Sequence, residues 1–219
     1  MAILEIQVAD GSFTGLGARN WNNLRAKVIA TVAAEDFGAT GDGTTDDSAA
    51  VLLAIASLPT TGGVIEFDQA SRYKLKLGAI TKQNVMFRGK NFVRNAAANV
   101  QFVPADNTDY ILQIGDGTTS CNGFRMEGIS MNGLGTGAKG MKINGADVCR
   151  YSSITVGGFT THGIYITSSA TISTQYQFFD GFEIQAQNGA SAIGLEIDYG
   201  SNFVAAIFFN NGLITDQSG

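Results

Sequence analysis

A five-residue phrase that returns at long intervals is the feature that most restricts how this chain can fold. The phrase reads Gly or Ser, apolar, any residue, apolar, then polar or small, and its internal period of two is that of a β-strand. Four copies start at residues 128, 153, 181 and 212, spaced by 25, 28 and 31 residues, and three start at 140, 163 and 194, spaced by 23 and 31 residues. Two interleaved series predict a solenoid in which each series advances by one coil.

The alternation inside the phrase predicts which side chains line the solenoid. The inward set, stacked between coils about 4.8 Å apart, is Met141, Ile143, Ile164, Ile166, Leu195 and Ile197. Lys142, Tyr165 and Glu196 are predicted to form an outward column. The similar segments 178–181 and 208–212 support this register, and 28 Gly against 2 Pro suit a chain with many tight corners.

The segment before the repeats has the pattern of a cap. Thr44 with Asp47 three residues later resembles a capping box, and the residues that follow are good helix formers up to Pro59, so we predict a short helix near residues 46 to 58. A Gly-Gly turn then leads into the apolar strand Val64–Phe67. We interpret the aspartates of this segment as turn formers and helix caps, because an EF-hand would need a Glu where Leu53 stands.

The stretch DFGATGDGTTDDSAAVLLAIASLPTTGGVIEF resembles the opening of the pectate-lyase-like superfamily of right-handed parallel β-helices. The likeness covers residues 34 to about 75, and in that family the stretch forms the N-terminal cap of the solenoid. The resemblance implies an all-β, right-handed parallel β-helix with a short N-terminal capping helix and an N-terminal arm. It carries little information on chemistry, since glycosidases, lyases and bacteriophage tailspikes all begin in this way.

Three regions follow from these patterns. Residues 1–33 form an N-terminal arm, residues 34–75 the β-helix cap, and residues 76–219 the coils, of which about four or five fit. The arm is too short to hold a core of its own and must dock on its own domain or on another chain. Because the last phrase runs into the C-terminus without a capping element, we expect the solenoid to be truncated or its end to be covered by a partner.

Glycoside hydrolysis needs two carboxyl groups facing one sugar. The best candidates are Glu183, Glu196 and Asp198, and Tyr165 is a candidate for a saccharide groove. The competing interpretation, that these carboxylates are solvated charges, is the stronger one. His162, the single histidine, is interpreted as structural, because the aspartates that accompany such a His-Gly pair in polygalacturonase-type relatives are missing.

Other partners and cofactors have little support in the sequence. A net charge of −5 argues against a nucleic-acid partner, and the longest apolar run, residues 49–56, argues against membrane insertion. Neither a metal nor another cofactor is predicted, since Cys121 and Cys149 lack ligand spacing and acidic residues that could bind calcium are too few. The two cysteines are interpreted as buried free thiols.

Three functions stay open at this point. The first is a phage tailspike or tail-fibre component that binds host surface polysaccharide, with any depolymerase activity residing in a longer β-helix. The second is a secreted pectate-lyase-like polysaccharide lyase or glycoside hydrolase, which the lack of a signal peptide disfavours. The third is a catalytically inert structural virion protein. Resemblance to tailspikes implies a homotrimer in the virion, docked through residues 1–33 to a phage tail or baseplate protein and acting outside the host cell.

Overall fold

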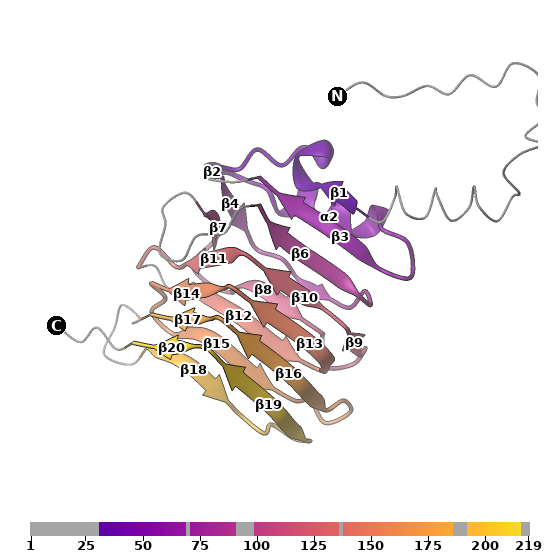
Figure 1. The fold of residues 1–219 in the computed structure, drawn as a ribbon, viewed down its shortest axis with the longest axis vertical. Helices are drawn as coiled ribbons and strands as arrows, with labels where there is room; N and C mark the ends of the chain where they lie inside the picture. The colour runs from indigo at the N-terminus through magenta and orange to yellow at the C-terminus, as the bar shows by residue number, and fades with distance from the viewer. Residues whose placement is uncertain (1–30, 69–70, 91–98, 136–137, 186–191, 216–219) are drawn as a thin grey trace, which may run out of the picture.

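The computed structural model describes residues 31–68, 71–90, 99–135, 138–185 and 192–215. These residues form an all-β parallel solenoid of about six turns, stacked from β1 at one end to β19 and β20 at the other (Figure 1). The predicted N-terminal arm falls almost wholly on residues 1–30, which lie outside the described residues.

The turns contribute strands to three parallel sheets, which we name A, B and C in the order in which the chain visits them. Sheet A pairs in the order β1 (Thr31–Ala33), β3 (Gly63–Phe67), β6 (Val85–Gly89), β10 (Arg125–Glu127), β13 (Ala146–Ser152), β16 (Thr174–Asp180) and β19 (Val204–Asn210), with β9 (Cys121–Asn122) beside β13. Sheet B pairs in the order β2 (Asp42–Asp46), β4 (Arg72–Leu75), β7 (Val100–Pro104), β11 (Ile129–Asn132), β14 (Thr155–Gly157), β17 (Glu183–Ile184) and β20 (Leu213–Ile214). Sheet C contains β5 (Ala79–Ile80), β8 (Tyr110–Ile114), β12 (Lys139–Asn144), β15 (His162–Thr167) and β18 (Ile193–Ile197).

The two series of repeated phrases correspond to two of these sheets. Phrases starting at 128, 153, 181 and 212 lie on sheet B, and those starting at 140, 163 and 194 lie on sheet C. In sheet C, Lys142 pairs with Tyr165 and Tyr165 with Glu196, so the predicted outward column is confirmed. The expected four or five coils in residues 76–219 agree with the structure, where β6 to β20 make four full turns and the start of a fifth, and the turns of the cap bring the described solenoid to about six.

The first described turn holds the helical part of the cap. After the 3-10 helix η1 (Ala34–Phe37) and strand β2, the helix α2 (Ser48–Ser57) takes the place that a sheet C strand occupies in the next turns. The predicted helix is confirmed, but its predicted capping box is wrong, because Thr44 lies in β2 and the Asp47 side chain makes no bond to the helix. The buried Asp47 carboxylate instead accepts the Thr40 N–H at 2.7 Å.

The core is a stack of inward side chains. Met141, Ile143, Ile164 and Ile166 are all fully buried, and aromatic rings fill the space beneath sheets A and B, with Phe67 and Phe102 centroids 4.9 Å apart. Cys121 and Cys149 are buried free thiols, as predicted. No helix among the described residues is long and apolar enough to span a bilayer.

A bend at the start of sheet A has a left-handed backbone residue in each turn from β3 to β19, either just before the sheet A strand or within it. Positive φ recurs there at Gly62, Asn84, Gly123, Val148, Tyr176 and Ala206. Glycine and asparagine adopt this conformation at low cost, whereas a β-branched residue such as Val148, at φ 52°, is strained. The bend therefore requires a left-handed backbone even where the residue, such as Val148, disfavours it.

Candidate functional site

The outer face of sheet C brings together three of the four residues that the sequence analysis singled out. Tyr165 lies in β15, Glu196 in the neighbouring strand β18, and Asp198 directly after it. Because inward side chains alternate with outward ones, strand register places these three groups on one face. Direct contacts bring Tyr110 and His162 beside Tyr165, with ring centroids 6.4 Å and 5.4 Å away.

A hydrogen bond and a close histidine–carboxylate contact hold this cluster in place. The Tyr165 hydroxyl donates to Asp198 Oδ2 at 2.8 Å, and Nε2 of His162 lies 2.6 Å from Oε2 of Glu196. The Tyr110 and Tyr165 rings are parallel within 13°, with centroids 6.4 Å apart. His162 begins β15 at a corner, as expected for a structural residue, and it also positions the Glu196 carboxylate.

The electrostatics of the cluster limit its acid–base chemistry. The Gly200 N–H and the Tyr165 hydroxyl, in that order of effect, lower the pKa of Asp198, which keeps this carboxylate ionised near neutral pH. Burial raises the pKa of the Tyr110 and Tyr165 hydroxyls, which keeps both neutral. Asp198 can therefore accept hydrogen bonds or a proton, but it does not fit the role of the protonated general acid in glycoside hydrolysis.

Glu183 does not join this cluster. It lies in β17 of sheet B, is only 6% exposed, and accepts a hydrogen bond from Gln185 Nε2 at 3.1 Å. The interpretation of Glu183 as a solvated charge is therefore wrong: its side chain is covered. Glu183 lies on sheet B, whereas Glu196 and Asp198 lie at sheet C, so Glu183 does not face one bound sugar together with them.

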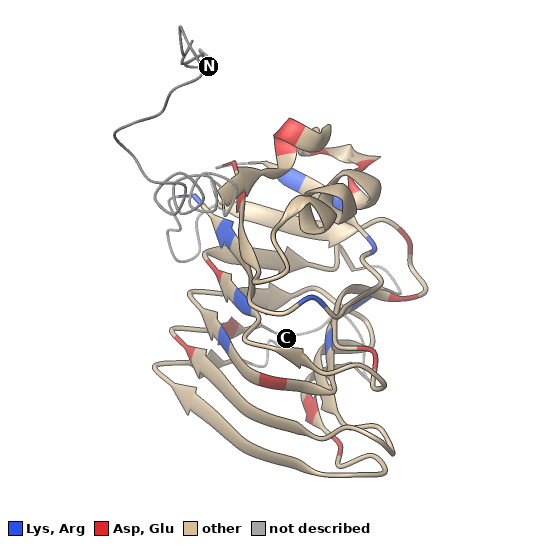
Figure 2. Cartoon of the chain, turned by 90° about the vertical axis from the view of Figure 1, so that its right-hand side faces the viewer, with Lys and Arg blue, Asp and Glu red and all other residues tan. Residues whose placement is uncertain are grey.

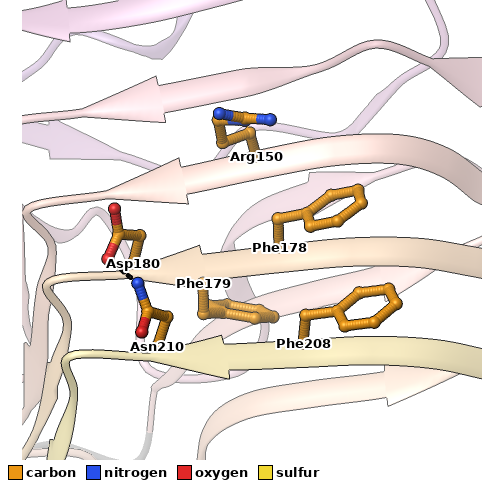
Figure 3. Close-up of a pocket in the computed structure, with 6 residues that line it drawn as sticks. All are labelled: Arg150, Phe178, Phe179, Asp180, Phe208 and Asn210. Atoms are coloured by element: carbon orange, nitrogen blue, oxygen red, sulfur yellow. Dashed lines mark hydrogen bonds between the residues drawn. The ribbon is translucent and has the colours of Figure 1, made fainter.

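A second surface, which the sequence analysis did not identify as a site, lies on the outer face of sheet A. Register aligns Arg150, Phe178 and Phe208 in one outward column and Ser152, Asp180 and Asn210 in the next. Between the two columns runs a hollow of about 180 Å³, which we call the trough; its lining residues are Arg150, Phe178, Phe179, Asp180, Phe208 and Asn210 (Figure 3).

The two walls of the trough differ in chemistry. On one side, the Phe178 and Phe208 rings stack at 4.9 Å between centroids, and the Arg150 guanidinium carbon lies 5.5 Å from the Phe178 centroid. On the other side, Asp180 Oδ1 accepts hydrogen bonds from the side-chain amides of Asn210 at 2.9 Å and Asn211 at 3.1 Å. One wall is thus cationic and aromatic, and the other is rich in hydrogen-bonding oxygen and nitrogen.

The repeat of segments 178–181 and 208–212 was the sequence signal that could have located the trough. It was used only to set the register, and that register is confirmed by the pairing of Phe178 with Phe208 and Asp180 with Asn210. Elsewhere, acidic and basic residues are interspersed down the stack (Figure 2). Within the described ranges, no cluster of three His, Cys, Asp or Glu residues has the arrangement of a metal site.

Comparison with known proteins shows which solved structures share this architecture. No family model and no curated protein matches the sequence. Among solved structures, ORF18 of Geobacillus virus E2 is similar, with a TM-score of 0.65 and 19% identity over 92% of this chain and 45% of that chain. Another is the tailspike protein gp49 of Acinetobacter baumannii bacteriophage Fri1, described as a capsular polysaccharide depolymerase, with a TM-score of 0.62 and 13% identity over 87% of this chain and 38% of that chain. At these identities the likeness establishes a shared β-solenoid fold, and this chain spans less than half the length of either protein.

Proposed function

We propose that this chain is a segment of a bacteriophage tailspike or tail-fibre protein and that it binds polysaccharide on the host surface. The proposal is supported by the β-solenoid, which this chain shares with a viral protein and with a phage tailspike. The first of the three functions that the sequence left open is therefore preferred over a secreted lyase or hydrolase.

The trough on sheet A is the observation that carries polysaccharide binding. A sugar ring presents C–H groups on its faces and hydroxyls around its edge, so it needs an apolar surface beside hydrogen-bonding groups. Phe178 and Phe208 supply the apolar wall, and Asp180 with Asn210 supply the polar wall. The trough crosses β13, β16 and β19, so it follows the solenoid axis and accepts an extended chain.

Adsorption to polysaccharide tests this function. The full chain would be immobilised and presented with a panel of purified bacterial capsular polysaccharides and lipopolysaccharides. We expect the wild type to bind at least one of them, and Asp180→Ala and Phe208→Ser each to weaken that binding about tenfold, a loss of about 1.4 kcal/mol. Asp36→Ala is the matched control, because Asp36 is exposed and lies in η1, far from the trough in the stack. A wild type that binds no polysaccharide, or trough variants that bind as well as it does, would contradict the proposal.

Any depolymerase activity is assigned to the longer protein of which this chain is a segment. Glu183 lies on another sheet than Glu196 and Asp198, so it does not face one sugar together with them, and the lowered pKa of Asp198 does not suit a general acid. We expect the chain alone to release no reducing ends and no unsaturated sugars from a polysaccharide that it binds. Release that Glu183→Gln or Glu196→Gln abolishes would show that these carboxylates are catalytic.

The assembly that accompanies this function is a homotrimer in the virion, attached through residues 1–33 to a phage tail or baseplate protein. Its support is the resemblance of residues 34–75 to the opening of tailspikes, together with the alternating pattern of residues 3–8, which suits addition of a strand to another chain. Light scattering should give the mass of three chains, and a monomer would refute the trimer. A variant that begins at Ala34 should fail to enter virions, and normal incorporation would refute the docking role.

A further inference from the structure

Two arginines lie side by side above the trough without an acidic partner. Arg125 in β10 and Arg150 in β13 are direct neighbours in the register of sheet A, and both are exposed. Among the described residues, neither forms an ion pair with a carboxylate. Like charges opposite each other in adjacent strands destabilise a sheet, so this pair is unfavourable unless an anion lies between them.

The neighbouring carboxylates either lie in another outward column of sheet A or are already hydrogen-bonded to other side chains. Glu127 shares the outer face of β10, but its partner by register is Arg88, which also pairs with Glu66. Asp180 is held by the amides of Asn210 and Asn211. The arginine column therefore keeps its positive charge in a chain whose net charge is −5.

Arg150 brings this positive charge into the trough, because it is one of the lining residues. Its guanidinium lies over the Phe178 ring, which restrains a long side chain and exposes its N–H fork along the wall. Arginine is suited to carboxylate binding because its N–H groups match the two oxygens. The facing wall, two residues along each strand, is roughly 6.6 Å away, about the width of one sugar ring.

We propose that the trough selects an acidic saccharide. The sugar carboxylate binds Arg150, with Arg125 beside it. The C–H face of the sugar contacts Phe178 and Phe208, and its hydroxyls bind Asp180 and Asn210. The inference rests on the proposed function and narrows it from polysaccharides in general to those that contain uronic acid or another carboxylate sugar.

A pair of simple glycosides isolates the carboxylate. Methyl β-D-glucuronoside and methyl β-D-glucoside differ only at C6, where one carries a carboxylate and the other a hydroxymethyl group. Titration of the ¹⁵N-labelled chain, followed by amide and Arg Nε–H chemical shifts, should show the glucuronoside binding about tenfold more tightly, with shifts at Arg150 and in β16. Arg150→Gln should remove this preference, and Arg72→Gln, an exposed arginine of sheet B, should keep it. Equal binding of the two glycosides, or no binding of the glucuronoside, would overturn the inference.

A second measurement distinguishes failure of acid selection from failure of the proposed polysaccharide binding. A bound polysaccharide that contains uronic acid would be compared with the same polysaccharide after its carboxyl groups are reduced to alcohols. Loss of binding on reduction supports selection of an acidic sugar. If the reduced form binds equally well and Asp180→Ala still weakens it, polysaccharide binding stands and acid selection is wrong.

Discussion

Val148 lies at a strained bend, and replacing it with asparagine should make the folded chain more stable. Val148 has φ 52°, and a residue with a Cβ in the left-handed region loses about 1–2 kcal/mol, with β-branched residues at the upper end. Asparagine tolerates this conformation, and Asn84 occupies the equivalent bend two turns earlier at φ 53°. Val148 is 56% exposed, so loss of its partial burial offsets less than about 1 kcal/mol. Val148→Asn should therefore stabilise the chain by about 1 kcal/mol.

The reciprocal variant is the control. Asn84 is exposed and shares the left-handed conformation, so Asn84→Val should destabilise the chain by about 1–2 kcal/mol. Urea unfolding followed by circular dichroism gives both changes, and the melting temperature should move by about 2–4 °C per kcal/mol for a chain of this size. A less stable Val148→Asn, or a more stable Asn84→Val, would show that backbone conformation does not limit stability at this bend.

Three further predictions concern the core, the acid stability and the thiols. Ile166→Asp places an unpaired charge between buried isoleucines and should cost at least about 4 kcal/mol in urea unfolding, whereas Gln113→Asp on the outer face of sheet C should cost less than about 1 kcal/mol. Hydrogen bonds from Lys76 and Thr108 lower the pKa of Asp106 to about 2. The contribution of Asp106 to stability is therefore present above about pH 4 and is lost as the pH falls toward 2. Asp106→Asn should flatten this part of the pH–stability curve, and an unchanged curve would contradict the assignment. Burial raises the pKa of Cys121 to about 12 and of Cys149 to about 11, so neither thiol should react with a disulfide reagent at pH 8 until the chain unfolds; rapid labelling of the folded protein would contradict this.

Sheets B and C could be predicted from the sequence because their phrases begin with residues that mark the corner. In the repeated phrases of sheet B a glycine or serine stands one or two residues before the strand, and in those of sheet C a glycine is the second residue of the strand. The inward and outward positions then alternate, as in Met141, Lys142 and Ile143. The outward column from Lys142 to Glu196 followed from this alternation. The fold and part of the sheet C cluster were therefore readable from local patterns.

Sheet A could not be predicted in the same way, because its longer strands contain the left-handed bend. In β16 the alternation restarts at Tyr176, so Thr174 and Gln177 both point inward although they are three residues apart. Neither Tyr176 nor Val148 signals a positive φ, and the period-two pattern is hidden. The trough was missed for this reason, and the alignment of Arg150 with Phe178 required the register itself.

The trough crosses three successive turns, and this has a mechanical consequence. A solenoid turn is held only by its neighbours, so local opening begins at an outer turn and spreads inward turn by turn. A saccharide that contacts β13, β16 and β19 at once stabilises their pairing. Separation of β19 from β16 then breaks contacts to the ligand as well as the hydrogen bonds between the strands. Amide hydrogen exchange in β19 should therefore slow as the trough fills, by a factor set by ligand concentration over its dissociation constant.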